Sequence, residues 1–163
     1  MGSGTVEPNF SDQRDVRIVP ISAEQTVKLR HCVLWPDHPV SHVLLPEDDT
    51  GKHYGAFIGS HDDPVAVISL FYEPLPKTSP DDGILPAMRF RKFACAVSEQ
   101  GKGIGTALLS HVIAIGSSDP TVTSIWCDAR LASAEWYQRR GMEPFGETFF
   151  KGPIEYVRMK IDV

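Results

Sequence analysis

Residues 98–116 read SEQGKGIGTALLSHVIAIG, so three glycines within five positions lead directly into an apolar segment. Glycine loses more conformational freedom on folding than any other residue. A glycine cluster at the start of a helix therefore indicates that a ligand must approach the backbone closely. The helix is predicted from residue 104, and its expected apolar stripe comprises Ile104, Ala107, Leu108, Val112 and Ile115.

Two common phosphate-binding motifs do not fit this loop. A Walker A motif requires Ser or Thr after its Gly-Lys pair, but the pair at 101–102 is followed by Gly103. A dinucleotide fingerprint requires a third glycine at the position that Leu108 occupies. The pattern that fits is Gln/Arg-x-x-Gly-x-Gly/Ala, carried by Gln100, Gly103 and Gly105.

The loop lies within an alternating order of strands and helices. Strands are predicted over 15–21, 53–59, 63–75, 84–97 and 122–129, helices over 22–35, 104–116 and 131–141, and two further strands within 143–163. A long loop, 36–53, separates the first helix from the second strand, and loops of this length are often functional. The pattern predicts one mixed α/β domain over residues 14–163, preceded by a disordered tail or cloning remnant over 1–13.

Composition excludes several classes of protein. The chain has 163 residues and a net charge of −5, which argues against a general nucleic-acid binder. It has no signal-peptide core and no run of about 18 apolar residues, so no membrane segment is expected. Cys32, Cys95 and Cys127 lie among apolar residues without metal-ligand spacing, so we expect buried free thiols, no metal site and a reducing compartment. These features predict a soluble, cytoplasmic monomer or homodimer that binds neither nucleic acid nor membrane.

Two segments resemble conserved motifs of a known family. The strand that ends in SEQGKGIGTALL resembles motif A of the GCN5-related N-acetyltransferases (GNAT), and AEWYQRRGMEPFGETF resembles their motif B. The resemblance covers 14–162 in element order and is specific over about 90–146. The tail is similar to small members that end in a Gly-Ile-x-His-x-x-Met-like strand, with Tyr156 in the place of His. The resemblance implies a mixed, mostly antiparallel sheet of six to seven strands, flanked by helices, with a splayed strand pair that holds the cofactor.

The resemblance also implies that acetyl-CoA is the co-substrate. Backbone amides of residues 101–106, at a helix N-terminus, are expected to bind its pyrophosphate, with Lys102 adding charge. The strand that ends at residues 93–95 is expected to splay from its neighbour and to pair with the pantetheine arm. The expected cofactor-binding residues are Phe93, Ala94, Cys95, Gln100, Gly101, Lys102, Gly103, Ile104, Gly105, Thr106 and Arg130. Arg130 replaces an Asn that many relatives carry, and it either contacts the cofactor or faces solvent. The alternative for the whole loop is a glycine-rich turn that caps a core helix.

Tyr137 holds the motif B position at which the family places its general acid. A tyrosine hydroxyl there gives a proton to the departing thiolate, while the amide of Cys95 is expected to bind the carbonyl oxygen. The alternative is that Tyr137 only packs on the core together with Trp136.

The general base is less well defined, because residues 84–97 contain no carboxylate where many relatives carry Glu. Glu73, at the end of SLFYE, is the favoured base, and Asp128 is a second carboxylate near the cleft. Deprotonation through ordered waters is an equal alternative. Three histidines, His38, His42 and His53, lie in or beside the long loop; histidine is suited to the role of base, but loop histidines are more often solvated side chains.

The sequence leaves the acceptor open. Arg89 and Arg91 favour an acidic acceptor, whereas the acidic stretch 46–51 favours a polyamine or lysine side chain. Aromatic walls are offered by Trp35, Phe71, Tyr72 and Phe149. The predicted function is transfer of an acetyl group from acetyl-CoA to a primary amine, on a small molecule, by direct transfer in a ternary complex. The alternative is a non-catalytic acyl-CoA-binding domain with a sensing or partner role.

Overall fold

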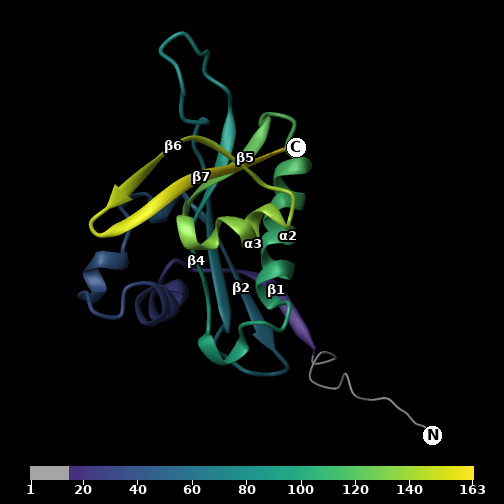
Figure 1. The fold of residues 1–163 in the computed structure, drawn as a ribbon. Helices are drawn as coiled ribbons and strands as arrows, with labels where there is room; N and C mark the ends of the chain where they lie inside the picture. Colours follow the sequence, from purple (N-terminus) through teal and green to yellow (C-terminus); the bar gives the residue numbers. More distant parts are fainter. Residues whose placement is uncertain (1–14) are drawn as a thin grey trace, which may run out of the picture. The chain divides into compact units, whose positions relative to one another are not determined.

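The computed structural model describes residues 15–163 (Figure 1). These residues belong to two compact units. The tail expected over 1–13 lies outside the described residues. The first unit extends to Ile68 and also contains Lys92–Leu108. The second unit consists of Ser69–Arg91 and Leu109–Val163.

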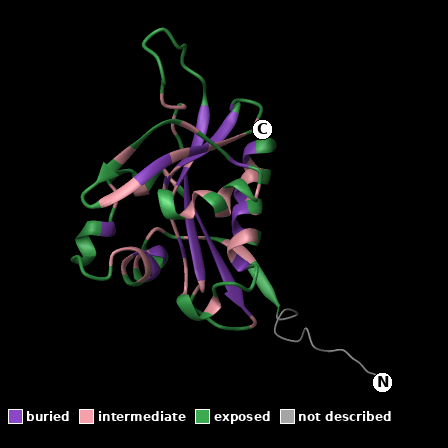
Figure 2. Ribbon diagram, in the orientation of Figure 1, coloured by how far each residue is buried: buried purple, intermediate pink, exposed green. Residues whose placement is uncertain are grey.

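Seven strands form a mixed sheet in the order β1-β2-β3-β4-β5-β7-β6. The strands are β1 (Val16–Ile21), β2 (Lys52–Ile58), β3 (Ala66–Tyr72), β4 (Ala87–Cys95), β5 (Ser124–Arg130), β6 (Glu143–Lys151) and β7 (Ile154–Asp162). The helices are α1 (Val27–Leu29), α2 (Ile104–Ser117) and α3 (Ala134–Gln138). The predicted fold class, a mostly antiparallel sheet of six to seven strands with flanking helices, is confirmed. Figure 2 shows how continuously β2 and β3 are buried.

The first helical segment is more irregular than the predicted helix over 22–35. A 3₁₀ turn (Glu24–Thr26) leads into α1, and a π-helical turn (Arg30–Leu34) follows. Ser22 and Gln25 cap the start of this segment: Gln25 N donates to Ser22 Oγ over 3.3 Å, and Ser22 N donates to Gln25 Oε1 over 2.9 Å. Leu29 packs this segment against the sheet, because it forms a buried apolar cluster with Val67 and Ala94.

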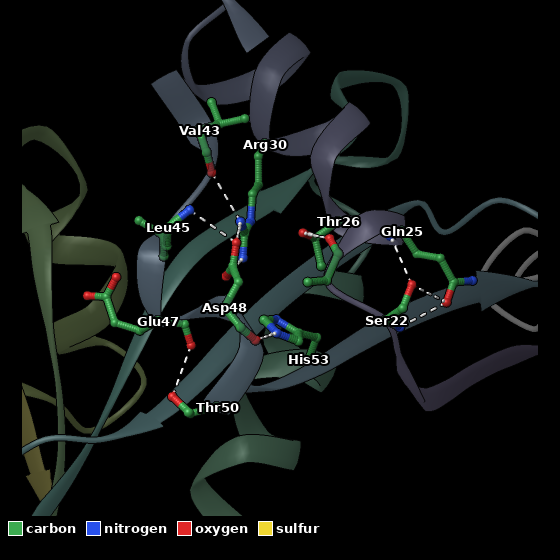
Figure 3. A network of polar contacts seen from close by, with 11 residues as sticks. Ser22, Gln25, Thr26, Arg30, Val43, Leu45, Glu47, Asp48, Thr50 and His53 are labelled. Atoms are coloured by element: carbon green, nitrogen blue, oxygen red, sulfur yellow. Dashed lines mark hydrogen bonds and ion pairs between the residues drawn. The ribbon is translucent and has the colours of Figure 1, made fainter. Parts of the chain in front are cut away.

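A buried ion pair fixes the long loop after this segment (Figure 3). The loop contains two 3₁₀ turns, Val40–Val43 and Pro46–Thr50. Arg30 has no solvent exposure and donates to Asp48 Oδ2 over 2.8 Å and Oδ1 over 2.9 Å, and also to the Val43 carbonyl over 3.1 Å. Burial alone would raise the pKa of Asp48, but the hydrogen bonds from Arg30 and from the Leu45 amide outweigh it, so this pKa lies below its ordinary value.

In the second unit, β7 pairs antiparallel with both β5 and β6. Alternate residues face opposite sides of a strand, so Ile125 and Cys127 share one face, which is buried. The end of α2 packs tightly there, because a Cβ added to Gly116 would lie 2.3 Å from Ile125 Cδ1. The opposite face carries Trp126 and Asp128, and the charged cluster around Asp128 that is described below lies on that face.

Two details of burial differ from expectation. Cys127 is buried and Cys95 half-buried, but Cys32 is exposed, because it lies on the outer side of the irregular helical segment rather than on its packed side. Ala107 is also exposed, and Leu109 takes its place in the buried stripe of α2. Hydrophobicity alone does not show which face of a short or mixed helix meets the core.

Candidate active site

The glycine loop occupies the turn between a 3₁₀ segment, Val97–Glu99, and the start of α2. Gly101 and Gly103 have φ angles of +79° and +85°, which L side chains rarely adopt. A Cβ at either position would meet no described atom within 4 Å. Both glycines are therefore required by backbone conformation, and the space beside them is open.

The amides of the loop are suited to an anion. The first turn of an α-helix has amides without an intrahelical acceptor, and the helix dipole adds positive potential there. The residues predicted to use these amides, 101–106, span the end of the loop and this first turn. Ile104, 4% exposed, anchors the turn on the core, while Gly105 and Thr106 are half-buried.

Gln100 ties the loop to the end of β4. Its Nε2 donates to the Cys95 carbonyl over 3.0 Å, so the motif glutamine has a structural partner. Lys102 Nζ lies 3.3 Å from Glu99 Oε1, and the lysine remains 38% exposed, which keeps its charge accessible to a phosphate. The Gln100 contact brings together two of the predicted cofactor residues, Gln100 and Cys95, within the first unit.

The end of β4 alternates in burial. Ala94 is buried, whereas Phe93 and Cys95 are half-buried on the other face of the strand. Burial first, and then the negative charge of Glu99, raise the pKa of the Cys95 thiol. A protonated thiol is a poor nucleophile, so Cys95 is not suited to covalent catalysis.

Pairing between β4 and β5 is short. In the second unit the parallel ladder consists of three pairs, Ala87↔Ser124, Met88↔Ile125 and Arg89↔Trp126. Both strands continue beyond the last pair, and β5 pairs with β7 on its other side as far as Arg130↔Tyr156. Within this unit the two strands therefore part after Arg89. Arg130, at the end of β5, is half-buried.

Tyr137 lies on α3 against the buried face of the sheet. Its ring centroid is 6.0 Å from that of Phe90 and 5.1 Å from that of Trp136. Burial first, and then the neighbouring Cys127, raise the pKa of Tyr137 well above its ordinary value. Among residues 15–163 its hydroxyl makes no hydrogen bond, and the residue as a whole is half-buried. Tyr137 is thus a protonated donor that the described chain leaves without an acceptor.

The two candidate carboxylates meet on the opposite face of the sheet, through Arg89. Arg89 Nη2 donates to Asp128 Oδ2 over 2.8 Å, and Nη1 donates to both oxygens of Glu73 over 3.3 Å. The two differ in access: the Asp128 side chain is 8% exposed and that of Glu73 is 41% exposed. The Glu73 carbonyl also accepts from Trp126 Nε1 over 3.0 Å, which fixes the end of β3.

Two further cations reach Asp128, and sequence reasoning missed both. Lys151 Nζ lies 3.1 Å from Asp128 Oδ2, and Arg158 Nε lies 3.4 Å from Oδ1. Both lie over aromatic rings: Lys151 is 4.6 Å from the Tyr156 centroid, and Arg158 is 4.9 Å from that of Phe149. The alternation of β7, which places Tyr156, Arg158 and Lys160 on one face, is the signal that predicts such a surface.

The loop histidines are not equivalent. His53 is buried, and its Nε2 lies 2.9 Å from the Asp48 carbonyl, so it belongs to the network that holds the loop (Figure 3). His38 and His42 stack at 4.3 Å beside Trp35. Desolvation, and then the nearby His38 and Lys92, lower the pKa of His42.

The other predicted aromatic walls are dispersed. Phe71 is buried within β3, while Tyr72 is exposed and donates to Asp119. Phe149 stacks on Tyr156 with centroids 5.9 Å apart. Of the predicted aromatic walls, Phe149 therefore borders the charged cluster in the second unit, beside Arg158.

Comparison with known proteins identifies the family. Residues 84–163, which include the glycine loop and Tyr137, match the model of the acetyltransferase (GNAT) domain. This part of the chain is a GNAT acetyltransferase domain. The predicted family is thereby confirmed, and with it the predicted class of enzyme, an acyltransferase whose co-substrate is acetyl-CoA.

Individual relatives agree with this assignment. An uncharacterised N-acetyltransferase of Bacillus subtilis, YitI, is 26% identical over 136 residues, which cover 82% of this chain and 87% of the relative. The crystal structure of a putative N-acetyltransferase from Lactobacillus plantarum has a TM-score of 0.72 at 17% identity, covering 90% of this chain and 97% of that one. The structure of Arabidopsis thaliana NAA60 in complex with acetyl-CoA has a TM-score of 0.71 at 12% identity, covering 91% and 100%. At these identities the two structures show that the GNAT fold is shared.

No helix within residues 15–163 is long and apolar enough to cross a membrane.

Proposed function

We propose that this GNAT protein transfers an acetyl group from acetyl-CoA to the primary amine of a small molecule, by direct transfer in a ternary complex. The observation that carries the proposal is the Tyr137 hydroxyl, which is desolvated, protonated and without a hydrogen-bond partner in the described chain. A protonated hydroxyl that makes no hydrogen bond within the described chain is available to donate one to a ligand. The names of relatives such as the Bacillus N-acetyltransferase support nitrogen as the acceptor atom.

In the proposed reaction the amine nitrogen attacks the thioester carbonyl carbon, and the carbon–sulfur bond breaks. Tyr137 gives its phenolic proton to the departing thiolate, and the proton lost by the amine nitrogen restores the phenol. The products are the acetamide, free CoA and the one proton released when the ammonium form of the acceptor becomes neutral. The raised pKa of Tyr137 keeps the acid protonated at neutral pH.

The proposed cofactor contacts lie in the glycine loop and at the end of β4. The amides of Gly101–Thr106 bind the pyrophosphate, and Lys102 supplies a positive charge. The Cys95 amide binds the thioester oxygen, where negative charge develops. The open space beside Gly101 and Gly103 supports this role over a simple helix cap, because a cap requires no such access.

Glu73 is the proposed base, which takes the proton that the ammonium form of the acceptor loses before the neutral amine attacks. It is 41% exposed and its contacts to Arg89 are long, at 3.3 Å, so an acceptor or a water reaches its carboxylate. Asp128 is buried and contacts three cations between 2.8 and 3.4 Å, which makes it a positioning residue instead.

The alternative, a non-catalytic acyl-CoA-binding domain, has one observation in its favour: both candidate bases are ion-paired with Arg89. It predicts binding of acetyl-CoA without turnover of any amine.

One experiment separates the two. The purified protein is titrated by calorimetry with acetyl-CoA, and with NADH and ATP as controls, and CoA release is then followed with a panel of primary amines. Saturable binding of acetyl-CoA alone together with amine-dependent CoA release supports the proposal. Binding without release from any amine favours the non-catalytic domain, and the absence of binding contradicts both.

A further inference from the structure

The side chain of Arg158 is fixed by two contacts, an ion pair and an aromatic ring. Its Nε lies 3.4 Å from Asp128 Oδ1, and its guanidinium carbon lies 4.9 Å from the centroid of Phe149. Asp128 and Arg158 are also direct partners in the β5–β7 ladder, so the backbone fixes both ends of this contact. The side chain is therefore oriented by an ion pair on one side and by a ring on the other.

The other end of this guanidinium has no partner. Among residues 15–163, neither terminal amino group of Arg158 makes a hydrogen bond, although the side chain is 35% exposed. Two parallel N–H donors on a planar group are the arrangement that binds a carboxylate or a phosphate in bidentate fashion. Nε, which faces Asp128, is not part of that fork.

The charges around Arg158 do not cancel. Arg89, Lys151 and Arg158 all contact Asp128, and Glu73 is the second carboxylate, so three positive charges face two negative charges. The buried members are Arg89 and Asp128, at 12% and 8% exposure, whereas Lys151 is 42% exposed. The excess positive charge thus lies at the accessible end, with Arg158 and Lys151.

We infer that the acceptor of this enzyme carries an anionic group, a carboxylate or a phosphate, and that Arg158 and Lys151 bind it. The inference rests on the proposed amine acetylation and names its substrate class. Arg158 and Glu73 belong to the same cluster, because Arg158 contacts Asp128 and Arg89 contacts both Asp128 and Glu73. A short acceptor whose anionic group binds Arg158 therefore has its amine on the side of Glu73, the proposed base. An amino acid or a small amino phosphate has both groups.

The inference also accounts for Asp128. Burying the Asp128 carboxylate costs desolvation free energy. In this inference, the function of Asp128 is to orient Arg158 and Lys151. Asp128 Oδ1 has no hydrogen bond although it is buried, which agrees with a role in orienting charge rather than in maximising contacts.

The test compares matched amines that differ only in the anion. L-amino acids are paired with their carboxamides, and phosphoethanolamine is paired with ethanolamine; spermidine and tyramine represent amines without an acid. The inference predicts that kcat/KM for an acidic member exceeds that of its neutral partner at least tenfold. The carboxylate and phosphate pairs show which anion is used.

Variants assign the preference to the cluster. Arg158→Gln is expected to reduce the preference at least tenfold and Lys151→Gln severalfold, with acetyl-CoA affinity unchanged. Arg139→Gln is the control, because Arg139 is 65% exposed and its contact is a 3.7 Å pair with Glu135. Calorimetric titration of the preferred pair into the CoA-loaded protein gives a readout independent of turnover, and the melting temperature shows that each variant is folded.

Three results overturn the inference. Equal use of acidic and neutral members, or turnover of spermidine and tyramine alone, removes it and leaves amine acetylation intact. A preference that survives in both variants shows that other residues bind the anion. Failure of every amine, with acetyl-CoA bound, removes the proposed function and the inference together.

Discussion

Arg89 on β4 donates a 2.8 Å hydrogen bond to Asp128 on β5, which lies two residues beyond Trp126, the partner of Arg89 in the last pair of the ladder. The bond therefore replaces backbone pairing where the strands part. Arg89 also stacks on Trp126, with its guanidinium carbon 4.7 Å from the ring centroid, so the arginine is fixed from two directions.

Asp128→Asn is expected to destabilise the protein strongly. It removes the one negative charge that Arg89, Lys151 and Arg158 share, and breaking a buried ion pair costs about 3–5 kcal/mol. Urea denaturation measures the loss. Asp162→Asn is the control, since Asp162 is 76% exposed and pairs with Lys160, and such pairs contribute roughly 0–1 kcal/mol. Similar losses in both variants would show that Asp128 does not organise the cluster.

Gly103→Ala is expected to weaken acetyl-CoA binding by about tenfold, equivalent to about 1.4 kcal/mol. The φ angle of +85° is strained for alanine, and the new methyl group projects into the space assigned to phosphate. Calorimetry with acetyl-CoA gives the affinity. Gly59→Ala introduces the same type of strain at φ +56°, also without a neighbour within 4 Å, but in the β2–β3 turn. Equal affinities in the two variants would exclude the glycine loop as the phosphate site.

Asp48→Asn is expected to change how the free energy of unfolding depends on pH. Because the folded pKa of Asp48 is lower than its ordinary value of 3.8, its stabilisation is complete above that value and is lost as the pH falls through the folded pKa. The wild type therefore loses this contribution below about pH 4. Asp48→Asn lacks the contribution already at neutral pH, so its free energy of unfolding depends less on pH below about pH 4. Urea unfolding from pH 7 to 3 tests this. The neighbouring Asp49→Asn, at an exposed position, should follow the wild type, and an Asp48→Asn curve parallel to both would contradict the account.

Much of the fold could be predicted from local patterns in the sequence. The strand and helix order, the glycine loop and the position of Tyr137 on α3 follow from periodicity, turn residues and motif spacing. These signals are local, so a single sequence contains them. The mixed α/β class followed from them, whereas the family and the mostly antiparallel sheet were implied by the resemblance of two motifs to the GNAT family; both are confirmed.

The charged cluster around Asp128 could not be predicted from such local patterns. Arg89 and Asp128 are 39 residues apart, and their contact depends on the register of β4 against β5. Arg89 was expected to face an acceptor, but it is occupied by two carboxylates, and Arg158 and Lys151 hold the accessible charge instead. Strand alternation shows which residues share a face, but not which cation reaches which anion.

The central claim is that Tyr137 is the general acid, and Tyr137→Phe tests it most directly. The measurement is kcat with saturating acceptor, together with the calorimetric affinity for acetyl-CoA. Tyr54→Phe is the control for loss of a buried tyrosine hydroxyl. The account predicts that kcat falls by about 100-fold or more, as loss of a general acid does, while acetyl-CoA affinity stays within about threefold of wild type. A kcat within about threefold of wild type would contradict the assignment, because the thiolate would then receive its proton from another source.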